Sequence, residues 1–289
     1  MALELEPTDA IVLRAICYRE ADQVLTLFTR AYGKVSALAR GSRRSRKRFG
    51  GALGSFTISR VELSRGRGEL LTMSSATSVR AYLELAADMA SLAHASYATE
   101  LVGEIAPPEQ PEPDIYDLLV ELYDVLSARG PSVSVLRAFE LRLLDHMGLA
   151  PVLDACVACG ATAPAILEAP GAILDPGRGG VTCSGCAPAT RNLGVRMLSR
   201  DARAALLAAR DASGLAAAHD GGVPPPAARQ AREALMSIVL SQVGRPMKSL
   251  EFAAKLAGSQ RGAPDDAAPE SSPEPSAEPS PELPDDGRR

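Results

Sequence analysis

Four of the five cysteines form two Cys-x2-Cys pairs, Cys156 with Cys159 and Cys183 with Cys186, with 23 residues between the pairs. A turn of this kind places two thiolates on the same side of the chain. Two such turns can surround one ion with four sulfurs at the corners of a tetrahedron, the arrangement that zinc prefers. Because four sulfur ligands leave no coordination position for water, the spacing predicts one structural, non-catalytic Zn2+ per chain.

Two other roles for these cysteines stay open. Redox-active pairs of the thioredoxin type lie at a strand-to-helix junction inside a βαβ pattern, and no such pattern surrounds either pair. Four unligated buried thiols are the remaining alternative. The fifth cysteine, Cys17, lies in an apolar, strand-like run and is predicted to be a core thiol.

A run of basic residues between positions 40 and 48 contains no acid. Guanidinium groups match phosphate oxygens with two hydrogen bonds each, and neutralised phosphates release counterions, so the run favours sequence-independent DNA binding. The predicted DNA-binding residues, with one lysine from the preceding strand, are Lys34, Arg40, Arg43, Arg44, Arg46, Lys47 and Arg48. The alternative is a solvated loop without a ligand. Tyr18, Tyr32 and Phe49 are near enough in sequence to stack on unpaired bases, although core packing is their favoured role.

Charge is distributed unevenly along the chain. Residues 1–80 contain 14 Lys and Arg against 7 Asp and Glu, a net charge of +7, whereas residues 81–289 carry a net charge of -11. Such an asymmetry indicates one surface suited to a polyanion on an otherwise acidic protein.

No catalytic arrangement accompanies these features. The three histidines (His94, His146 and His219) fall in two predicted helices and a Gly-rich loop, and the sequence contains no P-loop and no Gly-x-Gly-x-x-Gly. We therefore expect a protein that is not an enzyme. Five cysteines without a secretory signal, and no apolar run long enough to cross a bilayer, favour the cytoplasm and no membrane contact.

Short β-rich runs dominate the first 80 residues and predict the element that carries the basic run. They cover residues 10–18, 23–29, 33–39, 56–63 and 69–73. Five short strands within about 70 residues fit a small closed barrel, of which the OB-fold is the common nucleic-acid-binding type. Residues 1–80 are therefore predicted to form an OB-fold DNA-binding domain.

Helical periodicity begins after residue 80. Helices are predicted at 81–105, from Asp114 to about 128, from Ser132 or Ser134 to a C-cap at Gly148, and at about 199–210, 226–243 and 249–257. The fold class is therefore α+β. It comprises the N-terminal barrel, an α-helical domain (81–150 and 191–257), an inserted four-cysteine zinc module (151–190) and a disordered acidic tail rich in Pro and Glu (258–289).

Several segments keep a distinctive order and spacing between residues 10 and 257. They are Ala10–Arg14, Glu20–Asp22, Leu27–Thr29, Gly33–Gly41, Arg43–Ser45, Gly51–Leu53, Phe56, Leu136–Leu144, Gly148–Pro151, Cys156–Gly160 and Gly244–Ser249. Together they resemble the RecO family of DNA repair and recombination mediators. The resemblance implies an N-terminal OB-fold, a central helical domain and a four-cysteine zinc module.

The same resemblance implies a function in the RecF pathway of recombinational repair. It implies binding of single- and double-stranded DNA, annealing of complementary strands, and help in loading RecA onto coated single strands. Implied partners are RecR and the acidic C-terminal tail of single-stranded DNA-binding protein (SSB), in a cytoplasmic, nucleoid-associated setting.

A contact site for the SSB tail is predicted on the helix at residues 136–144. An acidic peptide that ends in Phe needs an apolar pocket with an arginine at its rim, and Phe139 with Arg137 or Arg142 supplies both. The alternative is that Phe139 is a core residue and that both arginines pair with local acids.

Two other functions stay open. A zinc-ribbon and OB-fold protein of the translation or transcription machinery would prefer RNA. A zinc-dependent enzyme that modifies nucleic acid would need an open position on the metal, which four thiolates do not leave.

Overall fold

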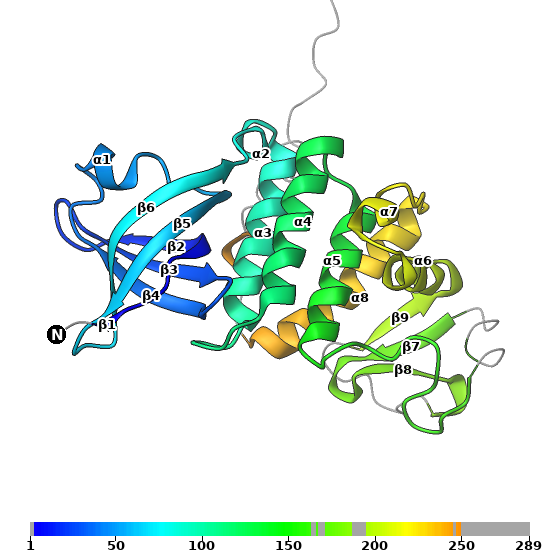
Figure 1. Ribbon diagram of the computed structural model, residues 1–289. Helices are drawn as coiled ribbons and strands as arrows, with labels where there is room; N and C mark the ends of the chain where they lie inside the picture. The colour runs from blue at the N-terminus through cyan, green and yellow to red at the C-terminus, as the bar shows by residue number, and fades with distance from the viewer. Residues whose placement is uncertain (1–2, 163–165, 167–170, 187–194, 245–246, 250–289) are drawn as a thin grey trace, which may run out of the picture.

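The computed structural model describes residues 3–162, 166, 171–186, 195–244 and 247–249. A barrel lies at one end, three long helices lie side by side in the middle, and a small sheet with further helices lies at the other end (Figure 1). This order agrees with the predicted fold class, a small N-terminal barrel followed by a helical region.

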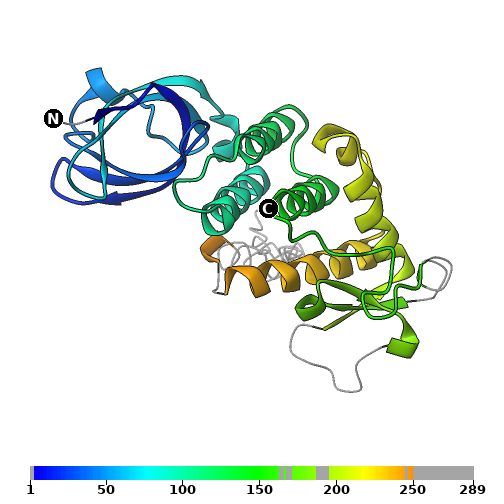
Figure 2. The same cartoon turned by 60° about the horizontal axis from the view of Figure 1, so that its bottom comes forward.

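The barrel has six strands in the spatial order β1-β5-β2-β3-β4-β6, and β6 also pairs with β5. The strands are β1 (Leu3–Glu4), β2 (Thr8–Cys17), β3 (Gln23–Thr29), β4 (Gly33–Ala39), β5 (Thr57–Arg65) and β6 (Leu71–Ala81). The parallel β4–β6 pairing and the antiparallel β5–β6 pairing close the ring, which Figure 2 shows end on. Closure of the sheet into a ring lets the main strands pair on both sides and leaves no long free edge.

Along each strand, alternate side chains point into the barrel and fill its interior. In β4, Val35 and Ala37 are buried while Ser36 between them is exposed. The interior is packed by aliphatic residues, among them Leu25, Leu27, Leu63 and Met73. This period-two pattern made the strands predictable from the sequence.

The central helices are α3 (Met89–Ile105), α4 (Pro113–Arg129) and α5 (Val133–His146), preceded by the short α2 (Glu84–Ala87). One continuous helical stretch was expected from residue 81. The structure instead extends β6 to Ala81 and interrupts the helix at Asp88, whose carboxylate accepts a hydrogen bond from the Ser91 N–H at 2.7 Å and caps α3.

The barrel is docked on the central helices by aromatic pairs and an ion pair. Phe28 lies 6.1 Å from Tyr116 between ring centroids, and Arg30 forms two hydrogen bonds to Asp117. Gly33 is required at this junction: it has a φ of +66°, and a Cβ there would lie 1.8 Å from the Gln110 carbonyl oxygen.

The other end of the molecule contains a three-stranded sheet in the order β8-β7-β9, covered by helices. The elements are β7 (Gly171–Asp175), β8 (Gly180–Thr182), β9 (Arg196–Ser199), α6 (Arg200–Asp211), α7 (Leu215–His219) and α8 (Pro225–Val243). The sheet therefore includes a strand beyond residue 190, the predicted end of the zinc module. Helix α7 was not predicted.

No helix within the described ranges is long and apolar enough to cross a bilayer. Apart from Ser249, the predicted helix at 249–257 lies outside the described residues, and so does the predicted acidic tail at 258–289.

Candidate metal centre and nucleic-acid interface

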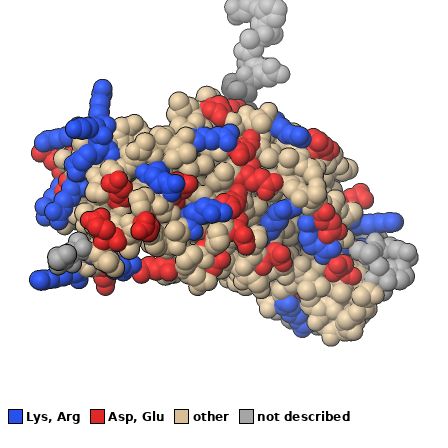
Figure 3. All heavy atoms as spheres, viewed as in Figure 1, with Lys and Arg blue, Asp and Glu red and all other residues tan. Residues whose placement is uncertain are grey.

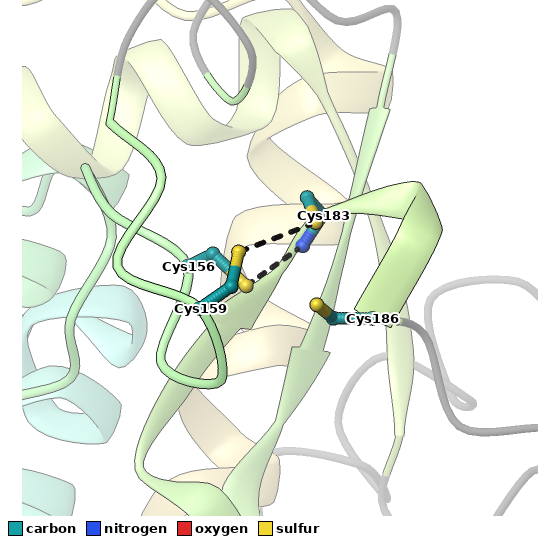
Figure 4. A group of neighbouring side chains, drawn as sticks. All are labelled: Cys156, Cys159, Cys183 and Cys186. Carbon is teal, nitrogen blue, oxygen red and sulfur yellow. Dashed lines mark hydrogen bonds between the residues drawn. The ribbon is translucent and has the colours of Figure 1, made fainter.

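The four paired cysteines come together at the edge of the small sheet. Cys156 and Cys159 lie on the loop that follows α5, and Cys183 and Cys186 directly follow β8. Their four sulfur atoms all lie within 4.8 Å of one another, and the side chains point toward a common centre (Figure 4). Within the described residues this is the only group of three or more His, Cys, Asp or Glu side chains with such a geometry.

Backbone hydrogen bonds hold the two cysteine turns against each other. The Val157 N–H donates to the Val181 carbonyl at 3.0 Å, and the Val152 N–H donates to the Gly179 carbonyl at 2.9 Å. Gly180 permits this approach, because a Cβ on that residue would lie 2.5 Å from the Val152 carbonyl oxygen. Directly after the first cysteine pair, Gly160 has a φ of +72° and closes the turn.

The surroundings of Cys156 favour a thiolate. The Cys183 amide donates to its sulfur at 3.4 Å, and this backbone hydrogen bond, with others from the first turn, lowers the pKa of the Cys156 thiol to about 6. Hydrogen bonds with Cys159 and Cys183 raise the pKa of the Cys186 thiol to about 12. Deprotonation of four thiols this close would place like charges side by side, and a cation bound between them would compensate those charges. The set can therefore hold a metal ion.

The basic run folds onto the turn between β2 and β3. The Arg43 backbone and side chain donate to the carbonyl oxygens of Ala21 and Glu20, and the Arg44 guanidinium pairs with the Glu20 carboxylate. The Gly41 N–H donates to the Asp22 carboxylate at 2.8 Å. The basic run is therefore an ordered segment that shares hydrogen bonds with a neighbouring hairpin.

The second half of the basic run is a short helix, α1 (Arg46–Phe49). Phe49 is buried in the barrel core and anchors α1, while the side chains of Arg46 and Lys47 are exposed. Arg48 folds back and donates to the Arg40 carbonyl at 2.7 Å. The basic side chains gather at the barrel end of the molecule (Figure 3).

Lys34 does not extend toward this basic surface. Its ammonium donates to the Gly103 carbonyl on α3 at 2.8 Å, inside a cleft of about 680 Å3 between the barrel and the helices. Its side chain therefore contributes to the junction of the two domains.

The residues flanking the basic run divide into buried and exposed ones. Tyr32 is half-buried, and its hydroxyl donates to the Glu6 carbonyl at 3.0 Å. Tyr18 is exposed. Cys17 is exposed as well, so the prediction of a core thiol is wrong: the β2–β3 hairpin extends past the barrel interior, and neither face of its end is covered.

The residues predicted to contact a partner peptide do not share one surface. Phe139 is 0% exposed and belongs to the core, which excludes it from a surface pocket and agrees with the alternative stated above. Arg142 donates to the Ala212 carbonyl. Arg137 donates to Glu140 at 2.8 Å, and the same carboxylate oxygen accepts a hydrogen bond from the Tyr97 hydroxyl at 2.7 Å.

Arg137 nevertheless lies in the wall of a cavity. The cavity has a volume of about 170 Å3, and Nε and Nη1 of Arg137 have no hydrogen-bond partner among the described residues. It is lined by Ala93, His94, Tyr97, Val133, Leu136, Arg137, Arg232, Met236 and Ser249. Arg232 and Met236 were missed in the sequence because α8 reaches α5 only through tertiary packing.

The chain is thus a modular protein that combines a closed OB-type barrel, a helical domain docked on it and a four-cysteine module, and barrels of this type include oligonucleotide binders. The family model "Recombination protein O N terminal" matches residues 1–82, and "Recombination protein O C terminal" matches residues 86–251. The chain therefore belongs to the RecO family of DNA repair proteins, as the resemblance predicted.

Named relatives agree with this assignment. The chain is 44% identical over 244 residues to the DNA repair protein RecO of Anaeromyxobacter sp. (strain K), which covers 84% of this chain and 93% of the relative. It is 35% identical over 257 residues to the DNA repair protein RecO of Myxococcus xanthus (strain DK1622), and that alignment covers 88% of this chain and 99% of the relative.

Proposed function

We propose that this protein is a non-enzymatic mediator of recombinational repair that binds DNA through its barrel and anneals complementary strands. The observation that carries the proposal is the ordered basic surface at the barrel end. Arg40, Arg46 and Lys47 have exposed side chains without an ion pair among the described residues, so their charge is available to phosphates. Annealing needs no bond chemistry; it needs two polyanions brought together with their repulsion screened.

The four cysteines are proposed to hold one structural Zn2+. The convergence of four sulfurs, one of them on a thiol with a lowered pKa, supports a tetrahedral thiolate site. When bound, the ion would cross-link the loop after α5 to the end of β8, and so stabilise the module against α8 without taking part in a reaction.

The cavity at Arg137 is proposed to receive the acidic, Phe-ended tail of SSB. Leu136 and Met236 supply an apolar wall, and the guanidinium groups of Arg137 and Arg232 supply charge for carboxylates. Phe139 and Arg142 are not part of this proposal, since Phe139 is buried and Arg142 binds a backbone carbonyl.

RecR and RecA complete the proposed pathway. RecR is the direct partner, and the result is the loading of RecA onto the SSB-coated single strand. Their support is membership of the family, because no surface described here distinguishes them. A preference for RNA over DNA of the same sequence would instead favour the translation or transcription alternative.

One experiment tests the proposed function. Purified protein is mixed with complementary single strands that SSB has coated, without ATP, and duplex formation is followed by fluorescence transfer between end labels. We expect annealing much faster than with SSB alone. Annealing no faster than this control would overturn the proposal.

A further inference from the structure

Tyr18 has an exposed aromatic ring at the tip of the β2–β3 hairpin. The residue is 57% exposed, and the Arg19 guanidinium lies 5.3 Å from the ring centroid. The other described aromatic residues are buried or half-buried. Leaving a large ring in water forgoes the stabilisation of burial, and no packing role in the described structure accounts for its position.

The ring stands at the end of an exposed face of the barrel. Arg14 and Ile16 on β2 and Tyr18 directly after it alternate along the chain, so they lie on the same side of the sheet, and all three are exposed. Toward Arg14 this face enters the cleft between the domains, where Glu100 and Glu104 line the opposite wall. Ile16 and Tyr18 do not line that cleft, so their end of the face is the part that lies exposed outside it.

Tyr18 and the basic run belong to one hydrogen-bonded unit. The Tyr18 N–H donates to the Asp22 carbonyl at 3.0 Å and closes the turn, and the Arg43 N–H donates to the Ala21 carbonyl of the same turn at 3.1 Å. The acidic side chain at the apex, Glu20, is paired with Arg44. The turn thus joins Tyr18 to the basic run, while the Asp22 carboxylate of the same turn accepts the hydrogen bond from the Gly41 N–H.

We infer that Tyr18, with Arg19 stacked on it, is a platform for an unpaired base and gives the barrel its preference for single strands. An aromatic ring stacks on any base, whereas bases in a duplex are already stacked on each other and are not available to it. The inference rests on the proposed binding of DNA by the basic surface. It adds a division of labour, in which cations hold the backbone of either form and Tyr18 detects the single-stranded one.

Tyr18→Trp tests the inference directly, because the chain contains no tryptophan and the new indole is a unique fluorophore. We expect strong quenching of its emission on saturation with an oligo(dT) strand, and little change with a duplex of the same length. Val79→Trp is the matched control, since Val79 is an equally exposed barrel residue on β6, and its emission should not respond to the single strand.

Affinity supplies the second measurement. Tyr18→Ala should weaken binding of oligo(dT) about tenfold and leave duplex affinity unchanged, while Tyr18→Phe should bind as the unaltered protein does. If the indole emission of the Tyr18→Trp variant is unaffected by saturating oligo(dT), or if Tyr18→Ala weakens both forms equally, the inference is wrong. The same assays on a variant with a neutralised basic run test the proposed DNA surface separately. If that variant loses DNA binding, the basic surface binds DNA even where the inference about Tyr18 has failed.

Discussion

The guanidinium of Arg137 and the carboxylate of Glu140 form a buried ion pair, 2.8 Å apart, one turn from each other on α5. Burial raises the pKa of Glu140, and the charge of Arg137 opposes that effect. Arg137 thereby has two tasks: one nitrogen compensates Glu140, and the side chain also lines the cavity, with Nε and Nη1 buried and without a hydrogen-bond partner among the described residues. Mutations at this site must separate the two tasks.

Arg137→Ala is expected to destabilise the protein by about 3–5 kcal/mol, because it leaves Glu140 buried without its cation. Thermal or urea unfolding measures this effect. Binding of the SSB tail peptide by this variant would therefore be hard to interpret, and Arg232 is the better probe. A variant with unchanged stability would show that Glu140 is neutral in the folded protein.

Arg232→Ala should weaken binding of the SSB tail peptide several-fold in fluorescence anisotropy and destabilise the protein less than Arg137→Ala does. Arg232 is exposed, it lines the cavity, and its charge acts on Glu140 less strongly than that of Arg137. Arg229→Ala is the matched control, an exposed arginine on the same helix that does not line the cavity. If Arg232→Ala binds the peptide as tightly as Arg229→Ala does, the peptide binds elsewhere.

Replacing Arg43, Arg44, Arg46 and Lys47 with alanine should flatten the slope of log K against log salt by about two units on duplex DNA. The maximum is about 0.9 per lost phosphate contact, and Arg43 and Arg44 also bind the hairpin. The loss should be uniform across sequences, since these side chains contact the backbone. The double variant Arg46→Ala and Lys47→Ala is the control for local unfolding. Their side chains have no partner in the described structure, so it removes two charges without removing the hydrogen bonds that Arg43 and Arg44 make to the hairpin. Wild-type affinity and slope in the quadruple variant would rule out this surface.

Elemental analysis should find one zinc per chain. Cys159→Ser should lower both zinc content and the unfolding midpoint, because metal binding contributes to the stability of the module. Cys17→Ser, at the exposed fifth cysteine, should alter neither quantity. A folded protein with far less than one zinc per chain would exclude the structural role.

Truncation after Gly258 should leave the thermal transition unchanged and tighten DNA binding. The removed segment carries eight acids and three arginines between residues 261 and 289, and this negative charge repels DNA. Replacing the eight acids with Gln or Asn in the full chain should reproduce the tighter binding. A lower unfolding midpoint after truncation would mean that the segment contributes to the fold.

The sequence alone determined the features that depend on local spacing. Alternation along residues 33–39 predicted a strand because period two has the same consequence wherever the strand lies, and the two Cys-x2-Cys pairs predicted a common site because few geometries satisfy four thiolates. The helix after residue 130 was predicted for the same kind of reason, from a stripe of apolar residues at helical spacing.

Tertiary structure decided what is buried and what meets across the chain. Ile16, Cys17 and Tyr18 continue an apolar strand pattern but extend past the barrel, so burial ended before the pattern did. Phe139 belongs to the core, while Arg137 two residues earlier reaches a cavity completed by Arg232, 95 positions away. Periodicity reports which side chains share a face of an element, whereas the packing of other elements determines which part of that face remains open to a ligand.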